Sequence, residues 1–359
     1  MHFPAQETVS SQDYRQRHAC YKSDADLQAV HRQHVFLVIW DDHEVANNAW
    51  RGGAESHGTA SSWPQRLSAA VQAYLEWMPV RESTDQTMSL YRDFRFGDLL
   101  QLNLLDTRLA GRDQPAHELA ERDQPQRTLL GKEQELWLEQ SLQTAQQQGV
   151  VWKLLGQQVM MAQLGTNERP FNYDQWDGYP AARERLFDLL EHQAIDNVVV
   201  LTVDVHSSWA LELHRDPYAK QSQPLALELV TPAVSSEAIS NQTRADLAAS
   251  SLQMLLPHLK FVDLYYRGYV LLDLTAERMQ AEWWVVDNVS SPRYRTECLH
   301  ALQIQAGQAS FTKATTLTEP KSQAPQPAPR YESEFAFLRR WQTEEVAAVS
   351  APLALSAQG

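Results

Sequence analysis

The sequence predicts a sheet-rich α/β sandwich, and three observations support this fold class. Four continuous apolar runs have the length and composition of buried strands, at residues 35–40, 99–105, 151–155 and 197–202. Two amphipathic segments with helical spacing lie between these runs, at residues 132–148 and 181–193. No glycine-rich phosphate loop follows any predicted strand, so the pattern does not indicate a doubly wound nucleotide-binding fold.

The other elements follow from local patterns in chain order. Residues 10–34 interleave polar and apolar side chains as a helix does, and residues 23–26 resemble a capping box. Gly149 is a suitable C-cap for the helix that precedes it. A β-like segment at 225–230 precedes a predicted hairpin, whose strands are 269–274 and 279–286.

The chain changes character near its end. Residues 305–330 are rich in Ala, Gln, Thr, Ser and Pro, a composition typical of a linker because it buries too little apolar surface to order itself. Residues 332–345 have the pattern of a short amphipathic helix. We therefore expect a main domain at 1–300 and a low-complexity tail at 301–359.

Composition narrows the classes of function. The 359 residues are 43% hydrophobic and 21% charged, which suits a protein with a large buried core. The formal net charge of −14 argues against a nucleic-acid-binding surface and is compatible with a cation site, although an acidic surface alone accounts for most of it. The 11 Trp residues favour an enzyme with pockets.

Targeting segments and cysteine spacing give further expectations. The first residues have no basic segment followed by an apolar one, so no signal peptide is predicted, and the chain as written is expected to be cytoplasmic. No run is apolar and long enough to predict a membrane span. The two cysteines, Cys20 and Cys298, form neither a disulfide framework nor a zinc-finger spacing.

The segment Asp41-Asp42-His43-Glu44 is the first candidate for chemistry. It places three carboxylates and an imidazole directly after a predicted strand, and such crowding is costly unless a cation compensates it. One carboxylate can face a metal while His43 faces a substrate, and the nearby Asn47 adds an amide oxygen. The alternative is a solvated acidic loop with helix-capping aspartates.

Asp204 and His206 form the second candidate. They follow the run 197–202, and residues two apart on a strand share a face, so both side chains would point to one side. An oxygen and a nitrogen donor placed in this way are typical of a transition-metal site. A buried Asp–His hydrogen bond is the alternative.

Two further segments offer weaker signals. Arg108 ends a predicted strand, where it can clamp a phosphate or form an ion pair with Asp106. The segment Trp176-Asp177-Gly178-Tyr179 is expected to be a cleft-lining loop that turns at Asp-Gly. Together with the acidic segments, these residues predict metal-assisted hydrolysis, in which a metal-activated water is the nucleophile.

Four ordered motifs resemble those of the PhoD-like alkaline phosphatase/phosphodiesterase family, and the resemblance covers roughly residues 8–290. The motifs are Trp40-Asp41-Asp42-His43-Glu44-Val45-Ala46-Asn47-Asn48, Leu105-Asp106-Thr107-Arg108, Trp176-Asp177-Gly178-Tyr179-Pro180 and Asp204-Val205-His206-Ser207-Ser208-Trp209. The resemblance implies a calcineurin-like metallophosphoesterase sandwich, with two mixed sheets flanked by helices. It also implies hydrolysis of phosphomonoesters and phosphodiesters with Ca²⁺ and Fe³⁺.

The resemblance also implies roles for individual residues. The metal ligands would be Asp41, Asp42, Asp204 and His206. His43 would stabilise the leaving group, and Arg108 would contact the phosphate. The residues assigned to substrate binding are Asn47, Trp176, Asp177 and Tyr179.

This chain departs from the family pattern before Asp41. Members carry an Ala-Cys segment and a Gly-Asp-Tyr-Ile-Tyr-Glu-like segment there, whose side chains help to bind the metals, and neither is found in residues 1–40. The resemblance thus implies an N-terminally truncated member of a family that is typically exported. An inactive remnant that acts as a binding or interaction module is the alternative function.

Overall fold

The computed structural model describes residues 3–55, 57, 61–81, 89–324 and 326. The chain divides into a larger unit of residues 1–18 and 37–319 and a smaller unit of residues 19–36 and 320–359. The smaller unit contains helix α2 (Ala25–Gln33), which begins where the Asp24 carboxylate accepts the Leu27 N–H at 2.8 Å. Helix α1 (Ser11–Lys22) begins in the larger unit.

A seven-stranded mixed sheet with the order β1-β2-β3-β4-β6-β5-β7 is the centre of the larger unit. Strands β2, β3, β4 and β6 run parallel to their neighbours in this order, whereas β1 and β5 run antiparallel to theirs. The strands are β1 (Arg92–Phe96), β2 (Leu100–Leu104), β3 (Trp152–Gly156), β4 (Val198–Thr202), β5 (Ser208–His214), β6 (Pro224–Val230) and β7 (Leu259–Asp263).

A second sheet of four strands covers one face of the first. It has the order β11-β10-β9-β8 and is antiparallel throughout, which differs in this detail from the two mixed sheets expected. Its strands are β8 (Arg267–Leu274), β9 (Arg278–Val286), β10 (Thr296–Gln305) and β11 (Thr312–Lys313).

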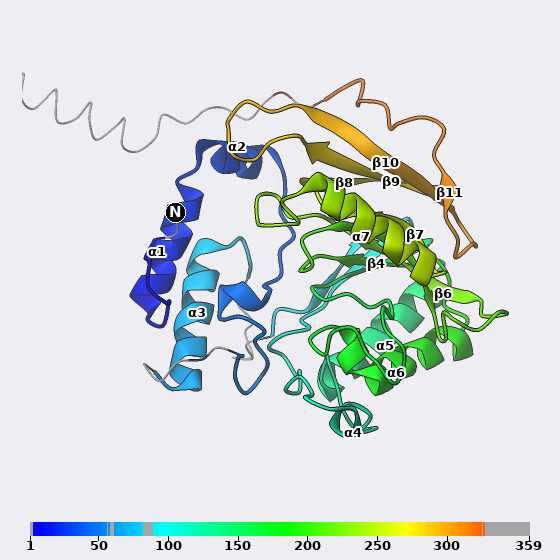
Figure 1. The fold of residues 1–359 in the computed structure, drawn as a ribbon, viewed down its shortest axis with the longest axis horizontal. Coiled ribbons are helices and arrows are strands. Elements are labelled where there is room, and N and C mark those ends of the chain that lie inside the picture. The colour runs from blue at the N-terminus through cyan, green and yellow to red at the C-terminus, as the bar shows by residue number, and fades with distance from the viewer. Residues whose placement is uncertain (1–2, 56, 58–60, 82–88, 325, 327–359) are drawn as a thin grey trace, which may run out of the picture. The chain divides into compact units, whose positions relative to one another are not determined.

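Alternation along the central strands builds the layers. In β4, Val199 packs toward the smaller sheet with Trp283, while Val198 and Val200 belong to the core shared with Leu186 on α6. Both faces of the central strands are therefore buried, as their continuous apolar runs predict. Figure 1 shows β9 and β10 at the top of the view and helices α5 and α6 below the large sheet.

The helices occupy the outer positions of the larger unit. Helices α5 and α6 cover the face of the large sheet opposite the smaller sheet, and α7 packs on β7. Trp40 and Tyr74 lie in a separate apolar cluster around α3. The helices are α3 (Trp63–Trp77), α4 (Leu119–Arg122), α5 (Lys132–Gln147), α6 (Pro180–His192) and α7 (Gln242–Leu255).

The structure confirms the predicted α/β sandwich and corrects several of its parts. Strands β2, β3, β4 and β6 and the hairpin β8–β9 lie at the predicted positions. The strand predicted at 35–40 is wrong, because side chains instead of a neighbouring strand bind this segment. The Val38 carbonyl accepts from Arg92 Nη2 at 2.6 Å, and the Trp40 carbonyl accepts from Gln158 Nε2 at 2.7 Å.

Two more predictions concern the ends of the chain. The helix predicted at 10–34 is broken into α1 and α2, since the Asp24 cap ends one helix run and starts the next. The domain boundary at residue 300 stays a prediction, but β10 runs across this position and β11 lies within the predicted linker. The helix predicted at 332–345 lies outside the described residues. Among the helices described, none has the length and apolarity that crossing a bilayer requires.

Candidate metal centre

The carboxyl ends of parallel strands bring the predicted site residues together. Strands β2, β3 and β4 are neighbours in the sheet, and their ends lead into Arg108, Gln158 and Asp204. The Gln158 side chain joins the end of β2 to the Trp40 segment, because its Oε1 accepts from the Thr107 N–H at 3.0 Å and its Nε2 donates to the Trp40 carbonyl at 2.7 Å. The same edge of the sheet thus holds segments from three distant parts of the chain.

The Arg108 guanidinium is the centre of the cluster. It is fully buried, and three carboxylates surround it. Its Nε donates to Asp41 Oδ1 at 2.7 Å, its Nη1 to Asp174 Oδ2 at 2.8 Å and its Nη2 to Asp204 Oδ1 at 2.5 Å. Asp42 Oδ2 lies 3.9 Å from Nη2. With Asp42, four carboxylates therefore face the Arg108 guanidinium. A second buried guanidinium, that of Arg112, forms an ion pair with Asp174 at 2.5 Å.

Three of these carboxylates form a group that could hold a cation. Asp41, Asp42 and Asp204 each offer an oxygen, and these oxygens lie within 4.8 Å of one another. The Asp41 and Asp204 side chains are 24% and 17% exposed, so solvent ions can reach them, whereas the Asp42 side chain is 5% exposed. Gln175 Nε2 donates to Asp204 Oδ2 at 2.7 Å and fixes the orientation of that carboxylate.

A short 3-10 turn, η1 (Asp42–Glu44), separates the functions of neighbouring residues in this segment. Asp41 caps the turn, and Glu44 Oε2 accepts the Asp41 N–H at 2.7 Å. Asp42 points inward, where its carboxylate accepts from the N–H of His43 and of Asn48 at 2.8 Å each. Asp41 therefore has the capping role that was the alternative interpretation, and the metal-ligand roles of Asp41 and Asp42 stay predictions.

The turn sends His43 outward. Its side chain is 75% exposed, and its Nε2 lies 4.0 Å from Asp42 Oδ2. His43 and Asn47 line a pocket of about 590 Å³ together with Arg17, Arg66 and His57. The Asn47 Nδ2 atom donates to Glu55 Oε2 at 2.8 Å, and the Asn47 amide oxygen takes no part in this bond. The His43 imidazole thus lies beside the Asp42 carboxylate and at the wall of a pocket, and its role in the reaction stays a prediction.

Burial dominates the electrostatics of the cluster. It raises the pKa of Asp41, although the Arg108 guanidinium opposes this shift. It raises the pKa of Asp204 to about 6 against the same opposition, with the charge of Asp41 adding to the rise. Burial also raises the pKa of Glu44 to about 7. The Asp174 pKa is lowered, because Arg112 and Arg108 outweigh the effect of burial. Burial thus disfavours the charged forms of Asp41, Asp204 and Glu44.

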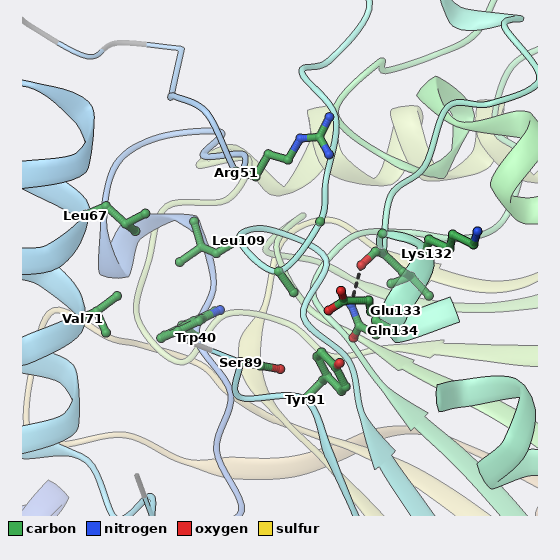
Figure 2. Close-up of a pocket in the computed structure, with 14 residues that line it drawn as sticks. Trp40, Arg51, Leu67, Val71, Ser89, Tyr91, Leu109, Lys132, Glu133 and Gln134 are labelled. Atoms are coloured by element: carbon green, nitrogen blue, oxygen red, sulfur yellow. Dashed lines mark hydrogen bonds between the residues drawn. The ribbon is translucent and has the colours of Figure 1, made fainter. Parts of the chain in front are cut away.

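A second cavity of about 700 Å³ lies on another side of Trp40. Figure 2 shows Trp40, Leu67, Val71 and Leu109 on one side of it and Tyr91, Glu133 and Gln134 across from them. Trp40 Nε1 donates to Asp106 Oδ2 at 2.8 Å, and Gln134 Oε1 accepts the Asp106 N–H at 2.8 Å. Asp106, whose pKa burial raises, therefore holds the Trp40 segment and α5 in place and does not pair with Arg108 through its side chain guanidinium.

His206 lies apart from the three carboxylates that the structure groups together. Its side chain is exposed, and its Nδ1 lies 3.1 Å from the Glu237 carbonyl. The argument that Asp204 and His206 share a strand face is wrong, because both follow the end of β4 and have positive φ angles of 65° and 54°. Its predicted role as a metal ligand stays a prediction.

Trp176, Asp177 and Tyr179 are buried, in and beside a second 3-10 turn, η2 (Trp176–Gly178). Asp177 pairs with Arg183 at 3.1 Å, and its Oδ2 accepts backbone N–H groups of the loop at 164–171. The Tyr179 hydroxyl donates to the Asp113 carbonyl at 2.7 Å. These contacts organise the loop. Trp176 also lines a pocket of about 480 Å³ together with Ala182 and Leu186, whereas Asp177 and Tyr179 are not among the residues that line it. The predicted role of Trp176, Asp177 and Tyr179 in substrate binding stays a prediction.

Two residues of the cluster were missed by the sequence analysis. Asp174 bridges Arg108 and Arg112, and Gln175 holds Asp204. Both directly precede the motif that begins at Trp176, so their position next to it was the available signal. Gln158 is a further residue without a predicted role, although its amide bonds to Trp40, Leu105 and Thr107.

The donor set fits a hard cation. Calcium prefers carboxylate and carbonyl oxygens, and three neighbouring carboxylates, two of them partly exposed, meet that preference. The three oxygens are fewer than the six to eight that calcium takes, so water or further groups would complete the shell. A single cation would also offset the negative charge that Arg108 leaves uncompensated.

Comparison with known proteins gives the family. The PhoD-like phosphatase family matches residues 1–283. Alkaline phosphatase D of Bacillus subtilis (strain 168) is 38% identical over 323 residues, which cover 87% of this chain and 54% of that protein. A solved structure described as the structure of PhoD matches with a TM-score of 0.78 and 34% identity, over 96% of this chain and 67% of that one. The chain thus spans about half the length of its curated relative. It belongs to the PhoD-like phosphatase family.

Proposed function

We propose that this chain contributes one wall of a metal-dependent phosphoester hydrolase site that acts on phosphomonoesters and phosphodiesters. The observation that carries the proposal is the arrangement of one short turn. Asp41 and Asp42 form a group of carboxylates with Asp204. The exposed His43 imidazole lies 4.0 Å from the Asp42 carboxylate and lines a pocket. The name of the similar protein, alkaline phosphatase D, supports the reaction class.

Asp41, Asp42 and Asp204 would hold the cation, with Ca²⁺ and Fe³⁺ as the proposed metals. When bound, such a cation supplies hydroxide near neutral pH and offsets charge on the phosphoryl oxygens. Gln175 fixes the Asp204 carboxylate, and the backbone N–H groups of His43 and Asn48 fix that of Asp42. These bonds keep the carboxylates in place before a substrate arrives.

His43 stabilises the leaving group in this proposal. Its exposed imidazole, 4.0 Å from the Asp42 carboxylate, can donate a proton to the leaving oxygen in this proposal. The Asn47 side chain lines the same pocket and is proposed to contact the substrate. From family resemblance, we also propose that His206 is a metal ligand and that Trp176, Asp177 and Tyr179 bind the substrate. Substitution of each residue, with hydrolysis as the measurement, tests these roles.

The test is hydrolysis of p-nitrophenyl phosphate and bis-p-nitrophenyl phosphate by the full chain, with added Ca²⁺ and Fe³⁺ and with metal content measured by elemental analysis. His43→Ala should lower kcat by about 10²-fold to 10⁴-fold, because it removes a positioned proton donor. His117→Ala, which removes an exposed histidine from a loop, is the matched control and should keep full activity.

Two results would contradict the proposal. Full turnover in His43→Ala would remove His43 from the reaction. An absence of turnover together with an absence of bound metal in the unsubstituted chain would instead support the alternative, a non-catalytic remnant that acts as a binding module.

A further inference from the structure

The carboxylates that could hold a cation already have a positive partner. Arg108 Nε and Nη2 contact Asp41 Oδ1 at 2.7 Å and Asp204 Oδ1 at 2.5 Å, and Asp42 Oδ2 lies 3.9 Å from Nη2. All three carboxylates of the candidate cation site thus face the same guanidinium. A cation that binds the oxygens next to Arg108 would compete with the guanidinium for them.

One of the carboxylates that contact Arg108 lies outside the cation group. Arg108 Nη1 pairs with Asp174 at 2.8 Å, and Asp174 is fixed in turn by Arg112 at 2.5 Å and lies outside the cation group. The contacts of Nε and Nη2 reach the more exposed carboxylates, Asp41 and Asp204. The guanidinium therefore has one anchor away from the cation group and two contacts that a cation could replace.

Electrostatics favours an exchange over an addition. A doubly charged cation beside Arg108 would repel the guanidinium, and burial weakens the solvent screening of this repulsion. With no cation, removal of the guanidinium would leave buried carboxylates uncompensated, which is costly. A cation on the oxygens that Arg108 contacts would therefore weaken these contacts.

We propose that Arg108 is a built-in counter-cation that stabilises the empty carboxylate cluster and that a bound metal ion displaces from Asp41 and Asp204. Asp174 retains Arg108 when this exchange occurs, so the side chain stays next to the site. Cation affinity is lowered by the work of displacing the guanidinium. This inference rests on the proposed function, since it takes Asp41, Asp42 and Asp204 as the cation ligands.

The test is calorimetric titration of the metal-stripped full chain with Ca²⁺ alone, with the thermal midpoint measured in parallel. Arg108→Gln should have a lower midpoint without Ca²⁺ and should bind Ca²⁺ at least about tenfold more tightly, because no guanidinium competes. Arg108→Lys keeps the charge but cannot reach three carboxylates, so its affinity should lie between the two. Ca²⁺ should raise the midpoint of Arg108→Gln more than that of the unsubstituted chain.

Arg183→Gln is the matched control. Arg183 is also buried and pairs with an aspartate, Asp177, at 3.1 Å, but it has no contact with the cation group. This variant should lose stability and keep the Ca²⁺ affinity of the unsubstituted chain.

The outcomes separate the inference from the function. Equal or weaker Ca²⁺ binding by Arg108→Gln would overturn the displacement and show that Arg108 only supports the ligands. If that variant does not fold, Arg108→Lys decides, since affinity no tighter than that of the unsubstituted chain overturns the inference. If the unsubstituted chain binds Ca²⁺ but the Ca²⁺ affinities of the Arg108 variants do not exceed its own, only the inference fails. If neither the chain nor any variant binds Ca²⁺, the proposed cation site fails as well.

Discussion

Two buried arginines in this molecule have opposite surroundings. Arg183 faces one carboxylate, Asp177, and its other donors reach the Met161 carbonyl at 3.1 Å and Gln163 Oε1 at 3.2 Å. Both side chains of this pair are at most 4% exposed. Arg108 faces several carboxylates, two of which are 24% and 17% exposed. We refer to the first as the closed pair and to the second as the open cluster.

The difference separates structure from chemistry. In the closed pair, one negative charge meets one positive charge, and the remaining Asp177 oxygen accepts backbone N–H groups, so nothing is left to bind. In the open cluster, burial raises the pKa of Asp41 and Asp204 although Arg108 opposes this shift. Four carboxylates face this one guanidinium. Partly exposed carboxylates that outnumber their positive partner form a candidate binding site, whereas a balanced pair without solvent access is scaffold.

The largest expected effect is on the closed pair. Asp177→Ala should lower the free energy of unfolding by about 3 to 5 kcal/mol, because it leaves the buried Arg183 guanidinium without its charge partner and removes the acceptor of the loop N–H groups. Urea denaturation measures the change. Asp123→Ala, which breaks an ion pair with a 56% exposed carboxylate, should cost at most about 1 kcal/mol. Loss of hydrolysis without loss of stability would make Asp177 a substrate residue, and the comparison would fail.

The next effect is on pH dependence near the closed pair. Burial lowers the pKa of His258 to about 4 from an ordinary 6.5, and Asp177 opposes this shift only weakly. Between pH 6.5 and pH 4 the unfolded state binds the extra proton, so stability should fall as the pH falls, by up to about 3 kcal/mol. Denaturation at several pH values checks this, and His258→Gln should remove that part of the slope. An unchanged slope in the variant would show that His258 is protonated in the folded protein.

The open cluster should tolerate neutralisation of one member. Asp204→Asn in metal-free buffer should change the free energy of unfolding by about 1 kcal/mol or less, because the lost Arg108 attraction is offset by relief of a carboxylate that burial disfavours. Its Ca²⁺ affinity should fall about tenfold or more. Asp273→Asn, in an ion pair away from the cluster, is the control and should keep the Ca²⁺ affinity. Destabilisation as large as that of Asp177→Ala would mean that the cluster is also scaffold.

The last prediction compares two buried tyrosines. The Tyr74 hydroxyl is buried and, in the described part of the chain, has no hydrogen-bond partner, so Tyr74→Phe should be neutral or stabilising by about 1 kcal/mol. The Tyr179 hydroxyl bonds to the Asp113 carbonyl and to Arg112 Nε, so Tyr179→Phe should cost about 1 to 3 kcal/mol. Thermal denaturation of both variants tests the difference, and equal effects would show that Tyr74 has a partner too.

Sequence patterns could predict the parts of the fold that are apolar on both faces. Strands β3 and β4 are continuous apolar runs, and the structure has them at the predicted positions. Strand β1 was missed, because Arg92, Asp93 and Arg95 make it polar and edge strands carry little apolar signal. The run at 35–40 was assigned to a strand because periodicity records apolarity and not which groups its backbone binds.

The candidate site could be predicted only in part. Carboxylates at strand ends indicated Asp41, Asp42 and Asp204, since parallel strands bring such ends to one edge. The ion pairs of Arg108 could not be predicted, because they join residues 67 and 96 positions apart. The positive φ of Asp204 likewise depends on the turn after β4 and gives no signal in the residue type alone.

The Gln158 side chain has a consequence for how this protein folds. It ties the Trp40 carbonyl to a position 118 residues later, and the Leu105 carbonyl to one 53 residues later. Contacts across such long stretches of chain form slowly, because the loops must close before the bonds are made. We therefore expect the carboxylate cluster to form after β2 and β3 have paired. A short fragment of the chain should not reproduce it, because the residues of the cluster are far apart in the sequence. Cation binding would then report on completed assembly of the sheet.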